Sequence, residues 1–320
     1  MHNILLLFDV PNWANHAACK ALKASLERAM PGRFNVRMVR NGARSAADFD
    51  WADLLFSHAF YDHRHTGHER SVSQVSGGNY LLRRQDPDNF PNAVANLQKW
   101  KHIVAKNRAL MNVLGPDDHP SIRLLYHPFD HEVFTPDGPA MDRDPDVFRV
   151  GFAGHTSSTS KGVRIMEEAV GRIDGADLVI TTYQKGTSGQ IPHDLMPQWY
   201  RSLDCYVCLP ARDVVPGDTD RRVLGEMEGG PRPPVEAMLC GVPLITSVGG
   251  QIGEMVTDGV TQAVVIERDA DHLEQAILML MRDTDMRQHF IKNGRMSIIK
   301  RWCLDVGQAW AEFFDEVLES

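Results

Sequence analysis

The sequence predicts an α/β protein of two domains, each built on a parallel sheet. A chain of 320 residues suggests about two domains, and 43% apolar residues are enough for two hydrophobic cores. Short apolar runs alternate with helical patterns along the chain, as in sheets covered by helices. A Pro- and Asp-rich segment, TPDGPAMDRDPD at 135 to 146, interrupts this alternation. We therefore expect a Rossmann-like N-terminal domain over 1–135, a linker over 136–147, a Rossmann-like C-terminal domain over 148–300 and a last helix over 301–320.

The expected elements follow from the apolar runs and their periodicity. In the first domain we expect strands over 4–8, 36–39, 54–56 and 122–126, with helices over 17–29 and 97–114. The second domain is expected to have strands over 148–153, 178–181, 205–209, 243–246 and 263–266, with a helix over 273–281. In the last segment, apolar residues recur at helical spacing from Val306 to Val317, so this helix must pack on one of the domains.

Charge differs between the two halves of the chain. Residues 1–135 hold 16 Lys and Arg against 13 Asp and Glu, a net charge of +3. The rest of the chain has a net charge of −11, which gives −8 for the whole chain. Five cysteines, an odd number mostly set in apolar runs, favour reduced core thiols over a disulfide framework. No apolar stretch is long enough for a membrane span or a signal peptide, so we expect a cytoplasmic protein.

The segment 228–262, EGGPRPPVEAMLCGVPLITSVGGQIGEMVTDGVTQ, is the most informative part of the chain. Its glycines allow the backbone to approach a ligand, and the amides of a following helix N-terminus favour an anion such as a diphosphate. Glu228 and Glu236, eight positions apart, are suited to accepting hydrogen bonds from sugar or ribose hydroxyls. Glu236 also fits a structural role at the start of a helix.

This segment resembles the nucleotide-sugar site of retaining GT-B glycosyltransferases, a family 4-like group also called glycosyl transferases group 1. The resemblance is carried by E-x7-E, then Ala237, Met238, Gly241, Pro243, Gly249 and Gly250. It extends to His127-Pro-Phe-Asp130 and to Val150-Gly-Phe-Ala-Gly154, and is weaker over residues 1–96. It implies two Rossmann-like domains with parallel sheets facing an interdomain cleft, and a last helix that crosses back to the N-terminal domain.

The resemblance also implies the activity, which is transfer of a sugar from a nucleotide diphosphate sugar, such as a UDP-sugar, to a hydroxyl with retention of configuration. No cofactor is expected. Catalytic candidates are Lys161, which would neutralise the leaving diphosphate, Glu228 beside the donor sugar, and His58, which follows a predicted strand and equally fits a packed histidine. Donor-binding candidates are Gly154, His155, Lys161, Glu228, Gly229, Gly230 and Glu236, with Glu236 on the ribose. His155 stands where the family usually has an arginine, and an insertion over 210–227 precedes Glu228.

The acceptor side is expected in the first domain, whose first loop lacks a glycine pair. Its candidates are Asn12, Trp13, Arg64, Arg70, Arg83 and Arg84, the four arginines belonging to a basic loop over 61–84. A saccharide or small-molecule acceptor is preferred. Through this loop a nucleic acid, including a modified base in DNA, stays an alternative, as do a sugar-nucleotide epimerase and a non-catalytic GT-B binding module.

Three metal-like patterns are present, and none favours a metal. Asp218-Thr-Asp220 lies in the polar insertion, and His63, His65 and His68 alternate with Arg64 and precede Arg70, whose positive charges disfavour a cation. Cys205 and Cys208 have metal-ligand spacing, but on a strand their thiols point to opposite faces. We therefore expect a metal-independent hexosyltransferase.

Overall fold

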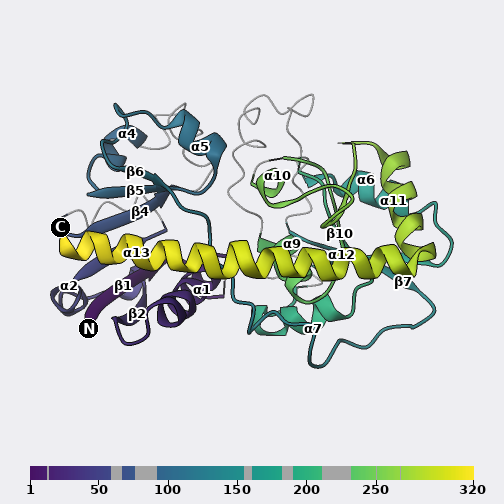
Figure 1. Cartoon of the computed structure of the whole chain (residues 1–320), viewed down its shortest axis with the longest axis horizontal. Coiled ribbons are helices and arrows are strands. Elements are labelled where there is room, and N and C mark those ends of the chain that lie inside the picture. Colours follow the sequence, from purple (N-terminus) through teal and green to yellow (C-terminus); the bar gives the residue numbers. More distant parts are fainter. Residues whose placement is uncertain are drawn as a thin grey trace. The chain divides into compact units, whose positions relative to one another are not determined.

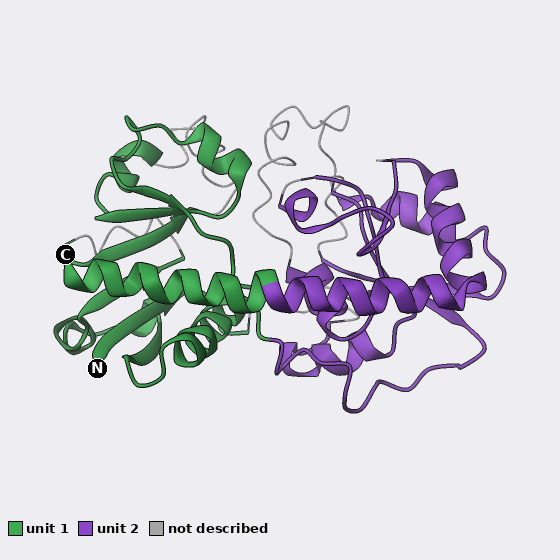
Figure 2. Ribbon diagram, in the orientation of Figure 1, with its two compact units in different colours: residues 1–130, 227–230, 301–320 green, residues 131–226, 231–300 purple. Residues whose placement is uncertain are grey.

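A computed structural model describes residues 1–12, 14–58, 67–75, 92–154, 161–181, 190–210, 232–249, 251–266 and 268–320. The chain forms two compact units (Figure 2). Unit 1 contains Met1–Asp130 and Arg301–Ser320, and unit 2 lies within His131–Lys300. Each unit has its own parallel sheet and its own buried core, as the alternation of strands and helices predicts.

The sheet of unit 1 has the order β2-β1-β3-β4-β5-β6, and every strand pair in it is parallel. Its interior strand β1, which lies between β2 and β3, contains the apolar run Ile4–Leu7, whose four side chains are fully buried. Continuous apolar runs of this kind are typical of parallel strands covered on both faces. The strands are β1 (His2–Phe8), β2 (Phe34–Arg40), β3 (Leu54–Ser57), β4 (Ser71–Val75), β5 (His102–Ala105) and β6 (Ile122–Leu124).

The helices of unit 1 are α1 (Ala14–Ala29), α2 (Ala46–Trp51), α4 (Ala93–Leu97), α5 (Arg108–Val113) and α13 (Val306–Glu319), with a 3-10 turn at Asn41–Ala43. The C-terminal α13, yellow in Figure 1, packs against α1 and β3. Trp310 and Phe314 lie on Phe56 of β3, with ring centroids 5.3 and 5.9 Å apart. The Trp310 indole also donates a hydrogen bond of 2.7 Å to the Tyr126 carbonyl.

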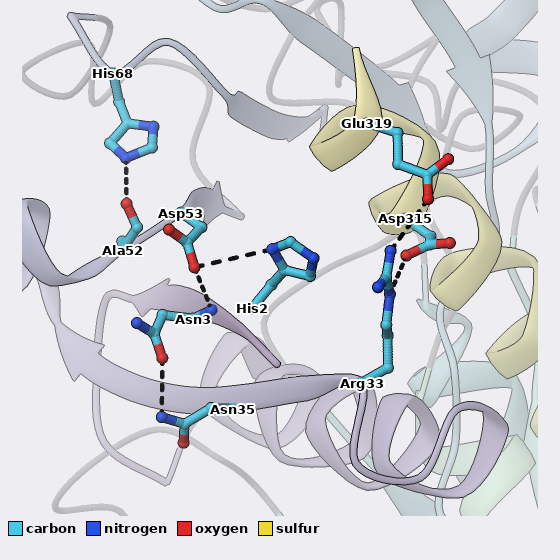
Figure 3. Close-up of polar contacts among 9 residues, drawn as sticks. All are labelled: His2, Asn3, Arg33, Asn35, Ala52, Asp53, His68, Asp315 and Glu319. Carbon is cyan, nitrogen blue, oxygen red and sulfur yellow. Dashed lines mark hydrogen bonds and ion pairs between the residues drawn. The ribbon is translucent and has the colours of Figure 1, made fainter.

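Polar contacts hold the end of α13 and the start of β1 (Figure 3). Arg33 donates hydrogen bonds to Asp315, at 2.5 Å, and to Glu319, at 3.2 Å, at the end of α13. Near the start of β1, the backbone N–H of Asn3 donates a hydrogen bond of 2.8 Å to the Asp53 carboxylate. The end of the chain is thereby fixed on unit 1, and α13 is part of the core of that unit.

The sheet of unit 2 has the order β11-β10-β9-β7-β8 and is also parallel throughout. Helices α6 and α11 pack against each other, and α9 packs against α7 and α12. The strands are β7 (Phe148–Ala153), β8 (Ala176–Thr181), β9 (Cys205–Cys208), β10 (Leu244–Thr246) and β11 (Ala263–Val264). The helices are α6 (Val163–Val170), α7 (Met196–Arg201), α9 (Arg232–Leu239), α10 (Ile252–Met255), α11 (Ala270–Arg282) and α12 (Thr284–Ser297), with a 3-10 turn at His193–Leu195 and a π-helix at Ile298–Asp305 before α13.

Two sequence-based expectations in unit 1 are wrong. The helix expected over 97–114 is α4, then β5, then α5. The apolar pair Ile103 and Val104, which fits a helical stripe, is instead a fully buried and β-branched part of a strand. The basic segment 61–84 is not one loop, because Ser71–Val75 form β4 and are all buried. Serine and glutamine in this strand conceal it from a hydrophobic pattern.

Candidate functional site

Strand order in unit 2 points to one edge of its sheet. The chain runs from β7 to β8 on one side and then to β9 on the other side of β7. In open α/β sheets, ligands bind outside the carboxyl ends of the strands at such a reversal. The ends of β7 and β9, at Ala153 and Cys208, therefore mark a candidate site, and Gly154 follows β7 directly.

Tyr206 fixes the end of β7 at this edge. Its hydroxyl accepts a hydrogen bond of 2.9 Å from the Ala153 amide and donates one of 3.3 Å to the Ala153 carbonyl. The residue is buried in β9, so the phenol joins the ends of the two strands. At Gly154 a side chain would meet the Phe152 ring at 2.9 Å, which favours glycine at this position. The backbone that leads into Gly154, a predicted donor-binding residue, is thus held in place.

Lys161 stands just before α6, at the same edge. Gly162, which caps α6, has a φ of +70°, and a Cβ there would lie 2.9 Å from the Cβ of Leu209, just beyond β9. Burial lowers the pKa of Lys161 below its usual range, and Cys208 offsets part of this effect. The pKa of the Cys208 thiol is itself raised by burial, to about 11. In its protonated form, the Lys161 amine at the switch point is suited to a negatively charged ligand.

The loop after β10 closes in on the end of β9. Ser247 donates a hydrogen bond of 2.8 Å to the Pro210 carbonyl, and Thr246 donates one of 2.7 Å to the Cys208 carbonyl. A Cβ on Gly249 would lie 2.9 Å from the Pro210 carbonyl oxygen. Glycine is therefore required at 249 by close approach of the two backbones. Approach of a ligand to this glycine, expected from the sequence, stays a prediction.

Glu236 lies in α9 and is 1% exposed. Its Oε1 accepts a hydrogen bond of 3.0 Å from Nε of Arg232, and its Oε2 accepts one of 3.0 Å from the Tyr200 hydroxyl. The His193 Nε2 lies 3.9 Å from the same Oε1. Both oxygens thus have partners within unit 2, and ribose binding by Glu236 stays a prediction. The i, i+4 spacing of Arg232 and Glu236 is visible in the sequence, whereas the contact with Tyr200 is not.

In unit 1 the strand order reverses between β1 and β3. Asn12 and His58 follow the carboxyl ends of these two strands. Asn12 has a φ of +62°, and its backbone N–H donates a hydrogen bond of 2.9 Å to Nδ1 of His16. His58 is buried, and its ring packs edge-on against Phe56 with centroids 4.8 Å apart. Both predicted residues therefore lie at a ligand-binding edge by topology.

The remaining predicted residues are only partly described. Arg70 directly precedes β4 and is half-buried. His68 is held within unit 1, since its Nε2 is 2.9 Å from the Ala52 carbonyl (Figure 3) and its Nδ1 accepts from the Arg70 amide at 3.2 Å. The following predicted site and metal-pattern residues lie outside the described part of the chain: Trp13, His63, Arg64, His65, Arg83, Arg84, His155, Asp218, Asp220, Glu228, Gly229 and Gly230.

Two further observations concern metals and membranes. Within the described ranges, no three His, Cys, Asp or Glu side chains gather closely enough to hold a metal ion. Among the helices described, none has the length and apolar character needed to cross a membrane.

Comparisons with known proteins agree with this architecture. Residues 186–297 match the family model for glycosyl transferases group 1. No curated protein matches the sequence. The solved structures that resemble the chain include Anabaena HepE in complex with UDP-glucose, at 16% identity and a TM-score of 0.70, covering 99% of this chain and 100% of the other.

Sucrose-phosphate synthase of Thermosynechococcus elongatus is similar at 14% identity and a TM-score of 0.71, with 100% of both chains covered. A glycosyltransferase of Rickettsia africae is similar at 12% identity and a TM-score of 0.66, covering 100% of this chain and 99% of the other. Structural similarity at 12–16% sequence identity shows that these proteins share a fold with this chain over its whole length. The chain therefore has the two-sheet α/β fold of GT-B glycosyltransferases, and its residues 186–297 match glycosyl transferases group 1.

Proposed function

We propose that the protein transfers a hexose-type sugar from a nucleotide diphosphate sugar to an acceptor hydroxyl. One observation carries the proposal: Lys161 lies at the switch point of the unit 2 sheet, beside the ends of β7 and β9. Negative charge builds on the diphosphate as the glycosidic bond breaks, and a fixed cation at that point stabilises the transition state. The group 1 match within the same unit supports this assignment.

UDP is the nucleotide that we propose for the donor. The Anabaena HepE structures that resemble this chain contain UDP or UDP-glucose. In the proposed complex the diphosphate lies against Gly154 and Lys161, while His155, Glu228, Gly229 and Gly230 complete the donor site. Glu236 would bind the ribose only if its carboxylate exchanged Tyr200 or Arg232 for ribose hydroxyls.

Retention of configuration and independence of divalent metals are further parts of the proposal. Both are implied by the resemblance of the motif series to the family. In this proposal Lys161, and not a metal ion, neutralises the leaving diphosphate. A saccharide or small-molecule acceptor on unit 1 is proposed over a nucleic acid, because the basic segment is interrupted by the buried strand β4. His58, at the switch point of unit 1, is the proposed catalytic contact of that unit. A cytoplasmic location stays a prediction of the sequence.

The test is a transfer and hydrolysis assay with UDP-glucose and other nucleotide sugars. We expect release of UDP that persists in EDTA, and an anomeric proton in the product with the configuration of the donor by NMR. Lys161→Ala should lower kcat by about 10² to 10³, and Arg164→Ala, a change of an exposed basic residue three positions later in α6, should not. Equal activity in the two variants would remove Lys161 from the mechanism. A sugar product of inverted stereochemistry, formed without any acceptor, would favour an epimerase.

A further inference from the structure

Three polar side chains share one face of the unit 1 sheet at its carboxyl edge. Ser57 of β3 pairs with Ser73 of β4, so the next residues, His58 and Gln74, are register neighbours. Gln74 pairs with Val104 of β5, and Lys106 lies two residues beyond Val104. Side chains at equivalent or alternate positions of paired strands point to the same face. His58, Gln74 and Lys106 therefore lie on one face.

A second histidine joins this group from the segment after β6. The His127 ring lies 5.5 Å from the His58 ring, centroid to centroid. All four side chains are withdrawn from solvent, since His58, Lys106 and His127 are each 4% exposed and Gln74 is 0% exposed. We call these four residues the edge cluster. Burial of so many polar groups at a strand edge is costly unless hydrogen bonds compensate for lost water.

Gln74 shows that the compensation is incomplete. Within the described part of the chain, neither its Nε2 nor its Oε1 has a hydrogen-bond partner. Buried amides are nearly always hydrogen-bonded, so an amide that lacks both a donor and an acceptor calls for a missing group. Nε2 needs an acceptor, and Oε1 needs a donor such as a hydroxyl.

The charge of the edge cluster indicates which chemical group would accept the hydrogen bond from Nε2 of Gln74. Lys106 brings an ammonium, His58 and His127 bring imidazoles that can become cationic, and none of the four side chains is acidic. Such a set favours a carboxylate or a phosphate over a cation, and the Oε1 of Gln74 adds a place for a neighbouring hydroxyl.

We infer that the edge cluster is an anion subsite, which binds the carboxylate or phosphate of a hydroxylated, sugar-type acceptor. The inference rests on the proposed function and narrows its acceptor to acidic sugars. It also assigns Gln74, Lys106 and His127 to binding, which the sequence motifs do not.

Binding to the whole protein tests this inference. Isothermal titration would compare glucose, glucuronate, glucose 6-phosphate and inorganic phosphate on the wild-type chain. We expect at least one sugar anion to bind and glucose to bind at least about tenfold more weakly, because a charge-assisted hydrogen bond is lost. Preference for glucuronate would identify a carboxylate acceptor, and preference for glucose 6-phosphate a phosphorylated one.

Variants locate the binding. Lys106→Gln and Gln74→Leu should each weaken binding of the preferred anion by about tenfold. Lys101→Gln, at an exposed lysine before the opposite end of β5, should leave it unchanged. If Lys106→Gln does not fold, as judged by circular dichroism, Gln74→Leu decides alone. Anion binding no tighter than that of glucose, or equal binding in the edge-cluster variants and Lys101→Gln, would overturn the inference.

UDP binding measured on the same samples separates this inference from the proposed function. UDP binding by a wild-type chain that shows no anion preference would overturn the anion subsite alone. A chain that binds acidic sugars through Lys106 but does not bind UDP would overturn the proposed donor and keep the subsite.

Discussion

The Arg232–Glu236 pair gives the sharpest stability prediction. The two side chains are 8% and 1% exposed, and Nε of Arg232 is 3.0 Å from Oε1 of Glu236. Arg232→Met removes the guanidinium and keeps an apolar side chain of similar length. The carboxylate then stays buried with only the Tyr200 hydroxyl as a described hydrogen-bond donor. Breaking a buried ion pair by removing one partner costs about 3–5 kcal/mol of unfolding free energy.

The expected change is large enough for a thermal melt. For a unit of this size, a loss of 1 kcal/mol lowers Tm by about 2–4 °C, so Arg232→Met should lower the Tm of unit 2 by about 6–20 °C. Tyr200→Phe should cost about 1.5–3 kcal/mol, since it removes a hydrogen bond to a charged group. Urea denaturation would give both free energies directly.

A double-mutant cycle supplies the control. Glu236→Gln removes the charge that Arg232 balances, so the double variant should be more stable than the sum of the single changes predicts, by about 0.5–3 kcal/mol. An Arg232→Met change below about 1 kcal/mol, or strictly additive changes, would refute the assignment of a buried, coupled pair.

Three more predictions test the framework of each unit. Tyr206→Phe should cost about 1–3 kcal/mol by urea denaturation, because it takes the acceptor from the Ala153 amide. Gly162→Ala should cost about 1–2 kcal/mol, because a φ of +70° is strained for alanine and its Cβ would press on Leu209; a neutral change would show a different backbone at this position. Burial lowers the pKa of His102, so folding favours its neutral form; stability is full above about pH 6.5 and falls as the pH drops below it. His102→Gln should reduce the loss of stability below about pH 6.5, measured as Tm in thermal melts at several pH values. An unchanged pH profile would show that another group causes this loss.

The α/β class can be predicted from the sequence because most strands coincide with short apolar runs. Ile4–Leu7 and the strand Cys205–Cys208 are buried on both faces, and burial of this kind leaves a continuous apolar run. The strand Ser71–Val75 is buried as well, but serine and glutamine occupy three of its positions. Its burial depends on the neighbouring strands β3 and β5, which local sequence does not specify.

The site divides in the same way. Lys161 is proposed from a Ser/Thr-rich segment before an apolar helical pattern, and Gly249 from a glycine pair after a short apolar run. Both patterns are local in the sequence. Tyr200 and Tyr206 cannot be predicted in this way, since their hydroxyls reach partners 36 and 53 positions away in the chain. The edge cluster is assembled from four strand ends, and only strand order brings Gln74 beside His58. Residues that depend on topology therefore become visible only in the folded chain.

The central claim is that the switch point of unit 2 binds the diphosphate of the donor through Lys161. Isothermal titration with UDP tests it most directly, on the wild-type chain, Lys161→Ala and the control Arg164→Ala. We predict that UDP binds the wild type and Arg164→Ala equally, and that Lys161→Ala weakens binding about tenfold or more. Because the pKa of Lys161 is lowered, wild-type affinity should also fall as the pH rises through that lowered pKa. Equal UDP affinity in all three proteins would contradict the account.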